Sequence, residues 1–297
     1  MSGADSEITP AAESPTGRRD DRLLSPLTAI VAVLLVVCFA PYLKWMWEIW
    51  MRSAYYGHGP LIPLISAYIV YSRRKDFLAA KGGHERWGIP ILGAGLVIYA
   101  VAVYWDVNFP QGFAMVMVIG GLTLLLWGWG RAKVLAFPIL FLVFMVPTGR
   151  LLVTQFSNPL QMHAAGIAAT AASFFGVPTK LHGTTIMIPD YTFEVAEPCS
   201  GLKSAIAMTA LAALLAYLVK APMWKRLLLF VAGVPIALLA NSVRITFTLF
   251  LGRAFGEGAA EGFFHTASGM MVFLLGLLGL FGVTKVLRCD HMRSDIW

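Results

Sequence analysis

The chain has 297 residues, of which 58% are apolar and only 13% are charged. Soluble domains average about 45–50% apolar and about 25% charged residues, so this composition excludes an ordinary soluble enzyme and indicates a multi-pass membrane protein. The net charge of +7 comes from small basic clusters between apolar runs, which is how a chain is oriented in a bilayer, and we therefore expect no nucleic-acid partner.

Residues 1–22 are polar, and we expect them to form a disordered cytoplasmic tail. A membrane helix needs about 20 mostly apolar residues. The runs within residues 23–287 predict an all-α polytopic membrane protein of about eight transmembrane helices, with seven or nine as alternatives. Residues 288–297 are expected to be a cytoplasmic C-terminal tail. The predicted spans are 24–43, 59–72, 88–105, 112–130, 133–150, 201–219, 226–248 and 266–286.

The basic residues predict the orientation. With the N-terminus inside, 16 of the 23 Lys and Arg residues fall on the inner side, and the excess recurs at every inner loop. We therefore expect an inner (cytoplasmic) membrane protein with both chain ends in the cytoplasm.

Residues 151–198 differ from the spans because they are less hydrophobic and richer in Gly and Pro. Within them, 151–175 has the spacing of an interfacial helix, and Thr184–Ile188 and Tyr191–Val195 are typical of short extended runs. We interpret this stretch as a small extracytoplasmic cap.

Three polar motifs fall at one predicted depth near the outer face. Cys199 lies in Glu197-Pro198-Cys199-Ser200-Gly201-Leu202-Lys203-Ser204, where the sixth span begins. Arg244 lies in Asn241-Ser242-Val243-Arg244-Ile245, in the outer part of the seventh, and His265 opens the eighth in Phe263-Phe264-His265-Thr266-Ala267-Ser268-Gly269. Ionisable groups in membrane segments are costly and usually have a partner or a function.

These residue types fit thiol chemistry. A cysteine at a helix N-terminus can have a lowered thiol pKa, because unpaired N–H groups and the helix dipole favour an anion. His265 can accept the thiol proton and return it to a leaving amine. Arg244 can stabilise an oxyanion or bind a substrate carboxylate, with Asn241 one turn away on the same face.

Structural roles compete with each of these interpretations. A lone membrane cysteine is usually a packing residue, which is the role expected of Cys38. Arg244 can pair with Glu197 or Glu261 or extend to the headgroups, and His265 can cap its helix. Small residues such as Gly201 and Ser204 can serve only close helix packing.

In their order along the chain, the Cys-Ser-Gly-Leu-Lys-Ser, Asn-Ser-Val-Arg-Ile and His-Thr-Ala-Ser-Gly motifs resemble the exosortase/archaeosortase family. The stretch Tyr55-Tyr56-Gly57-His58-Gly59-Pro60 is similar to its early His-Gly motif, so the resemblance covers roughly residues 40–286. It implies a membrane cysteine transpeptidase that cleaves a C-terminal sorting signal of the PEP-CTERM type from exported proteins.

By this resemblance Cys199 corresponds to the nucleophile, Arg244 to the family arginine and His265 to the family histidine. Pro198 stands where a small residue is common and Lys203 where an arginine is common, which puts the subtype in question. We further expect Ser200, Gly201 and Asn241 to contribute to the oxyanion site. Other expected substrate contacts are His58, Ser204 and Glu197.

The partners expected are C-terminally tagged exported proteins, membrane lipid, and a glycan or lipid acceptor. His163 and His182 are predicted to face outward with several acids, but no spacing typical of a metal site occurs, and no glycine-rich nucleotide motif is present, so no metal and no cofactor are expected. The rival interpretations are a transporter and a scaffold component of an exopolysaccharide export system, in which Cys199 only packs.

Overall fold

The computed structural model describes residues 26–53, 55–148, 150–189, 191–195, 201–255, 263–289 and 291–293. The chain divides into two compact units, residues 1–40 and 41–297. Helix α1 (Pro26–Arg52) begins in the first unit, where its side chains are apolar and largely exposed, and ends in the second.

The second unit consists mainly of helices. These are α2 (Leu61–Ser72), α3 (Arg74–Ala79), α4 (Gly88–Tyr104), α5 (Asn108–Phe141), the 3-10 helix η2 (Leu142–Met145), α6 (Arg150–Phe174), α7 (Leu202–Leu218), α8 (Met223–Phe255) and α10 (Phe263–Val286).

Length and composition identify candidate membrane spans among the described residues. Four helical stretches are long and apolar enough to cross a bilayer, namely Thr28–Arg52, Asn108–Met145, Met223–Phe255 and Gly269–Val286. Helices α2, α4 and α7 are apolar but shorter. These helices support an all-α membrane protein, whereas the number of eight spans stays a prediction.

Helix α5 is two helical segments joined at Gly128. This residue has φ 76° and ψ 176°, a backbone region that is essentially restricted to glycine. A Cβ built on Gly120 would lie 3.9 Å from Ile139 Cγ2, although a straight helix would separate these positions by about 28 Å. The chain therefore folds back at Gly128, close to the predicted break between the spans 112–130 and 133–150.

A three-stranded antiparallel sheet follows α6. Its strands are β1 (Lys180–His182), β2 (Thr185–Ile188) and β3 (Tyr191–Glu194), in the order β1-β2-β3. The extended runs that the sequence predicted are β2 and β3, whereas β1 was not predicted, because its three residues are too few to show a pattern. Gly183, with φ 63°, begins the turn that joins β1 to β2.

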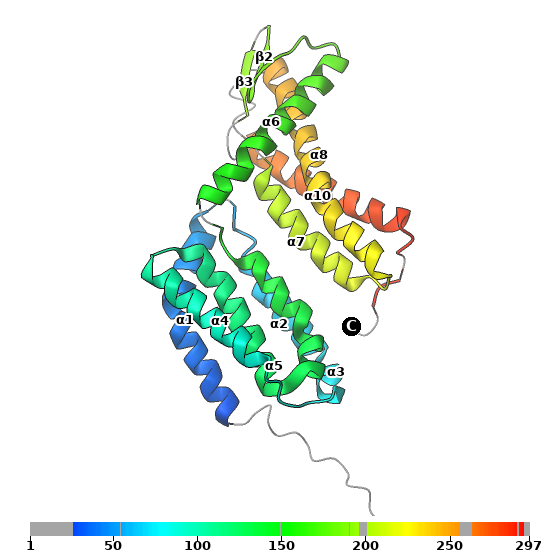
Figure 1. Cartoon of the computed structure of the whole chain (residues 1–297). Helices are drawn as coiled ribbons and strands as arrows, with labels where there is room; N and C mark the ends of the chain where they lie inside the picture. Colours follow the sequence, from blue (N-terminus) through cyan, green and yellow to red (C-terminus); the bar gives the residue numbers. More distant parts are fainter. Residues whose placement is uncertain are drawn as a thin grey trace, which may run out of the picture. The chain divides into compact units, whose positions relative to one another are not determined.

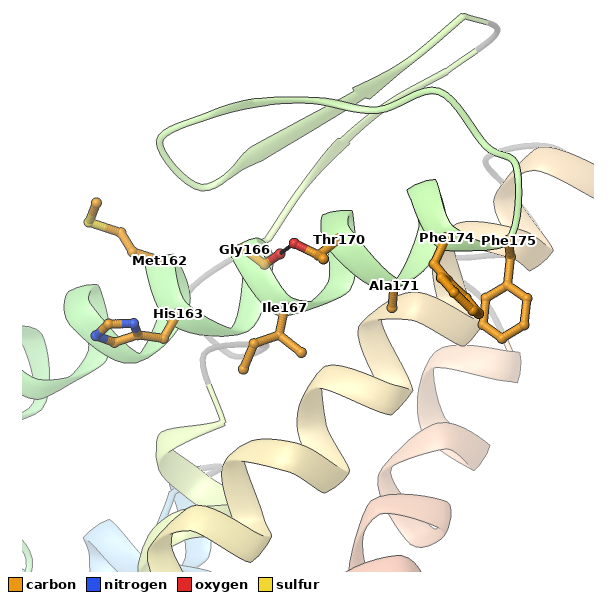
Figure 2. A pocket seen from close by; sticks show the side chains of 8 residues that line it. All are labelled: Met162, His163, Gly166, Ile167, Thr170, Ala171, Phe174 and Phe175. Carbon is orange, nitrogen blue, oxygen red and sulfur yellow. Dashed lines mark hydrogen bonds between the residues drawn. The ribbon is translucent and has the colours of Figure 1, made fainter.

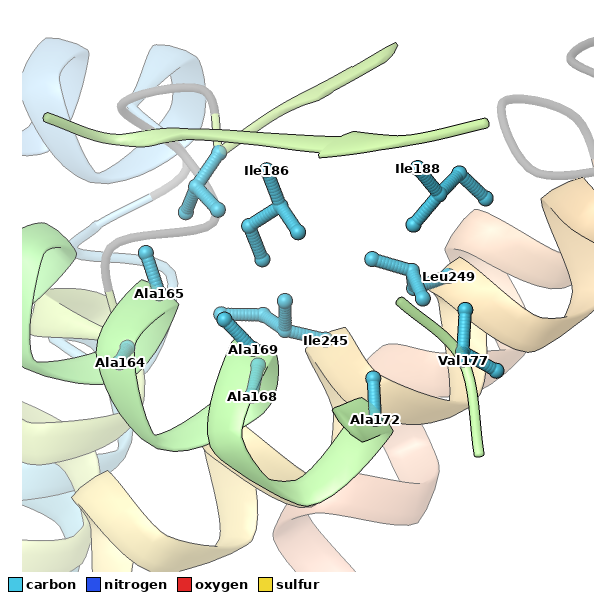
Figure 3. Close-up of a cluster of buried hydrophobic side chains, with 11 residues drawn as sticks. Ala164, Ala165, Ala168, Ala169, Ala172, Val177, Ile186, Ile188, Ile245 and Leu249 are labelled. Carbon is cyan, nitrogen blue, oxygen red and sulfur yellow. The ribbon is translucent and has the colours of Figure 1, made fainter. Parts of the chain in front are cut away.

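The predicted cap has a hydrophobic core that it shares with α8. Alanines on one face of α6 lie under the inward side chains of β2, and Ile245 and Leu249 of α8 complete the cluster (Figure 3). Small alanines let the helix approach the sheet and α8 closely. The cap segment is therefore packed directly on the helix that carries Arg244.

The other helices of this unit form two groups. Helices α2, α3 and α4 pack on α5, and α7 and α10 pack on α8 (Figure 1). The groups meet where the ring of Tyr217 stacks on Phe137, with 3.8 Å between centroids.

One end of these helices, here called the basic end, brings together described Lys and Arg residues from several of the clusters that were predicted to face inward, whereas Arg18, Arg19 and Arg22 lie outside the described residues. A Cβ on Gly82 would lie 3.0 Å from Arg131 Cζ, Arg73 Nη1 donates to the Tyr217 hydroxyl at 3.1 Å, and Lys225 Nζ donates to the Leu287 carbonyl at 2.6 Å. These contacts bring residues from separate basic clusters to the same end. Which side of the membrane this end faces stays a prediction.

Candidate active site

The first and second motifs meet at the end of the helices opposite the basic end. Gly201 is the N-cap of α7 and has φ 81°, in the left-handed region that favours glycine. A Cβ built on it would lie 2.9 Å from Asn241 Nδ2 and 3.1 Å from Asn241 Cγ. Position 201 therefore requires glycine both for its backbone and for the close approach of Asn241.

The amide side chain of Asn241 is buried at this junction. Its side chain is fully buried on α8, and the neighbouring Ser242 is 2% exposed and donates its hydroxyl to the Leu238 carbonyl at 2.9 Å. Arg244 is half-buried and lies three residues further along α8, so it occupies the same face as Asn241. Ile245 then enters the core of the cap.

The contacts of α10 with α8 indicate how far along the helices the His265 motif lies. A Cβ on Gly279 would lie 2.8 Å from Ile236 of α8, and Lys225 near the start of α8 contacts Leu287 just beyond the end of α10, so the two helices are antiparallel. Helix α10 is continuous from Phe263. Counted along both helices from the contact of Gly279 with Ile236, at a rise of 1.5 Å per residue, the backbone of His265 lies within about two turns of the level of Arg244.

Several predicted site residues lie outside the described part of the chain. These are Glu197, Cys199 and Ser200, together with the side chain of His265. Cys199 precedes Gly201 by two residues, and two residues span at most about 7 Å. Cys199 therefore adjoins the junction of Gly201 with Asn241 in the sequence, and its position and catalytic role stay predictions.

The turn after α1 is held by aromatic side chains. Tyr56, 4% exposed, accepts a hydrogen bond from the Thr148 amide at 3.0 Å and donates to the Thr148 carbonyl at 3.1 Å. Trp50 Nε1 donates to the Met145 carbonyl at 2.9 Å. Sequence reasoning missed Thr148 and Met145, because only the folded chain brings them to this turn.

The same turn carries His58 toward the first turn of α7. Burial lowers the pKa of His58 below its ordinary value, and the positive charge of Lys203 lowers it further, against a hydrogen bond to the Phe144 backbone. Its Nε2 is buried and has no hydrogen-bond partner among the residues that the structure describes. Burial therefore favours the neutral form of the His58 imidazole, and the charge of Lys203 links this histidine to the cysteine motif. Ser204 is half-buried on α7.

An apolar surface borders this region along α6 and α8. One open pocket of about 630 Å³ follows a face of α6 from Met162 and His163 to Phe174 and Phe175 (Figure 2). A groove of about 330 Å³ adjoins it and has walls from both helices. It is lined by Ile167, Ala171, Phe175, Leu239, Ser242, Val243, Thr246, Phe247 and Phe250.

Comparison with known families identifies the family of this chain. The profile of the transmembrane exosortase family (Exosortase_EpsH) matches residues 50–282, most of the chain. The chain belongs to the transmembrane exosortase family. Searches of the curated proteins and of the solved structures found no match.

The matched region of this exosortase begins at Trp50 and ends within α10. It contains the His58 turn, the cap and all three polar motifs. The region that the family profile matches is therefore the part of the chain in which Gly201 contacts Asn241, while most of α1 and residues 283–297 lie outside it.

Proposed function

We propose that this exosortase is a membrane cysteine peptidase and transpeptidase that cleaves a C-terminal sorting signal from exported proteins. Family membership and the contact of Gly201 with Asn241 support the proposal, because this contact joins the cysteine motif to the arginine motif. The reaction takes place at the end opposite the basic end, on the extracytoplasmic side of the inner membrane.

The first step is thiolate attack. The N–H groups in the first turn of α7 have no partners within the helix, and the helix dipole is positive there, so both favour the anionic form of Cys199. Its sulfur forms a bond to the carbonyl carbon of the scissile peptide. Arg244, Asn241 and the backbone near Ser200 and Gly201 stabilise the oxyanion that develops.

The second step releases the C-terminal fragment. As the C–N bond breaks, His265 gives the leaving amine the proton that it accepted from the thiol, and a thioester on Cys199 remains. An amine or hydroxyl of a glycan or lipid acceptor then attacks the thioester and regenerates the thiol. Arg244 can instead act mainly by lowering the thiol pKa, and Arg244→Lys separates these roles because lysine keeps the charge but loses the bidentate geometry.

In this proposal the apolar helix of the substrate binds in the groove between α6 and α8. Leu239, Val243 and Phe247 project from α8 at helical spacing and are 57%, 51% and 44% exposed. Val243 and Ser242 lie within one turn of Arg244, so a helix in this groove would lead its preceding tag to the polar motifs. A cysteine at position 243 should crosslink to a cysteine in the substrate helix, whereas Val231→Cys, on the same helix and 54% exposed, should not.

The decisive test compares two cysteine variants with the same substrate. The substrate is an exported protein that ends in a short polar motif, an apolar helix and a basic tail. Cys199→Ala should leave it uncleaved, whereas Cys38→Ala, at an exposed position of α1, should process it normally. Normal processing by Cys199→Ala would refute the nucleophile assignment. Trapping the thioester by mass spectrometry distinguishes the enzyme from a scaffold, and inactivation by thiol alkylation from outside distinguishes it from a transporter.

A further inference from the structure

Tyr217 contacts two arginine side chains at the basic end, far from the three motifs. Its ring is 4% exposed and stacks on Phe137. Arg73 donates to its hydroxyl at 3.1 Å, and the guanidinium of Arg293 lies 5.1 Å from the ring centroid. Arg73 follows the last residue of α2, and Arg293 lies in the described residues 291–293 after α10, here called the C-terminal segment. The fold therefore brings these two cations to one ring.

The C-terminal segment is held in place by backbone hydrogen bonds. The Arg293 amide donates to the Leu218 carbonyl at 2.8 Å, and the Lys220 amide donates to the His291 carbonyl at 2.9 Å. Met292 forms an antiparallel bridge with Val219 between these two bonds. Arg293 is therefore positioned against the end of α7 by the fold.

A third guanidinium completes the cluster. Arg226 Nε donates to the Ala216 carbonyl at 2.6 Å, which satisfies one of the last carbonyls of α7. Arg226 is close enough to Arg293 for their charges to repel each other. Asp76 binds Arg73 at 2.8 Å and balances one of the three charges. The described part of this cluster is therefore a compact site of net positive charge.

Aromatic residues around the cluster identify the membrane interface. Tyr71 is 63% exposed with the Arg74 guanidinium 4.0 Å from its ring centroid, and Trp224 is 61% exposed with Lys225 Nζ 5.6 Å away. Exposed Tyr and Trp beside basic residues are typical of the headgroup level of a bilayer. The arginine cluster therefore lies where lipid phosphates are most concentrated.

We infer that Arg73, Arg226 and Arg293 form a binding site for the phosphate of an anionic phospholipid headgroup in the cytoplasmic leaflet. Guanidinium groups bind phosphate oxygens in bidentate geometry, and basic pockets between membrane helices are known to bind anionic headgroups. A bound phosphate offsets the repulsion between Arg226 and Arg293. It also connects α2 with α7, α8 and the C-terminal segment.

The test uses native mass spectrometry of the purified full-length protein with phosphatidylglycerol or phosphatidylcholine as the probe. Arg226→Gln and Arg293→Gln are made separately, so that a folding failure in one leaves the other informative. Each should bind phosphatidylglycerol about fivefold or more weakly, at about 1 kcal/mol per basic residue, with binding of phosphatidylcholine unchanged. Arg86→Gln is the matched control, because Arg86 is exposed in the loop before α4 at the same end.

Unchanged binding of phosphatidylglycerol by a folded Arg226→Gln or Arg293→Gln protein would overturn the inference. An equal loss in Arg86→Gln would also overturn it, since it would show a general effect of charge. Inorganic phosphate is added in a further experiment. If it displaces phosphatidylglycerol and stabilises the protein equally well, the site takes free phosphate and the lipid assignment is wrong.

Discussion

Replacing Gly201 with alanine tests whether the first two motifs meet as described. A non-glycine residue in the left-handed region costs about 1–2 kcal/mol, and φ at this position is 81°. The new Cβ would lie 2.9 Å from Nδ2 of the fully buried Asn241, and overpacking of such a site costs about 1–3 kcal/mol. We expect Gly201→Ala to lower the free energy of unfolding by about 2–5 kcal/mol.

The assay is the Tm of the purified protein in one fixed detergent, in single and double variants. In the Asn241→Ala background most of the crowding atoms are absent, so Gly201→Ala should cost only the backbone component of about 1–2 kcal/mol. Gly282→Ala is the control, because this exposed glycine of α10 has no atom within 4 Å of a built Cβ, and alanine there should be neutral or stabilising. An equal cost in both backgrounds would refute the contact with Asn241, and no cost in either would refute the left-handed start of α7.

Three further substitutions test other parts of the fold. Tyr56→Phe should destabilise the protein by about 1–3 kcal/mol because the Thr148 amide loses its partner, and an unchanged Tm would contradict this. Gly128→Ala should lower the free energy of unfolding by at least about 2 kcal/mol, because its backbone region is essentially closed to alanine and backbone atoms of Gly83 would lie 3.0 Å from the new Cβ. A destabilisation smaller than this, measured from Tm, would count against the fold-back of α5. Burial lowers the pKa of His58, so the unfolded chain binds this proton at higher pH than the folded chain, and Tm should fall as pH decreases from 7 to 5. His58→Gln should weaken that dependence, and an identical pH profile in the variant would show that His58 is not responsible.

Much of the helical framework was predictable from local composition. The predicted spans 59–72, 88–105 and 201–219 agree with α2, α4 and α7 to within two residues. An apolar run long enough for a helix is a property of neighbouring residues, so it can be read along the chain. Short elements such as β1 carry too few residues for a pattern, and its partner strand, not its own sequence, determines that it is a strand.

Hydropathy and charge along the chain are enough to identify a membrane protein and to locate its basic clusters, and the residue types single out three motifs as candidates for thiol chemistry. Three features become visible only in the folded chain. Gly201 packs on Asn241, His58 is within the electrostatic influence of Lys203, and arginines from α2, α8 and the C-terminal segment gather at Tyr217. The physical reason is that hydropathy and charge act locally along the chain, whereas close packing and shared electrostatic fields depend on which distant residues the fold brings together.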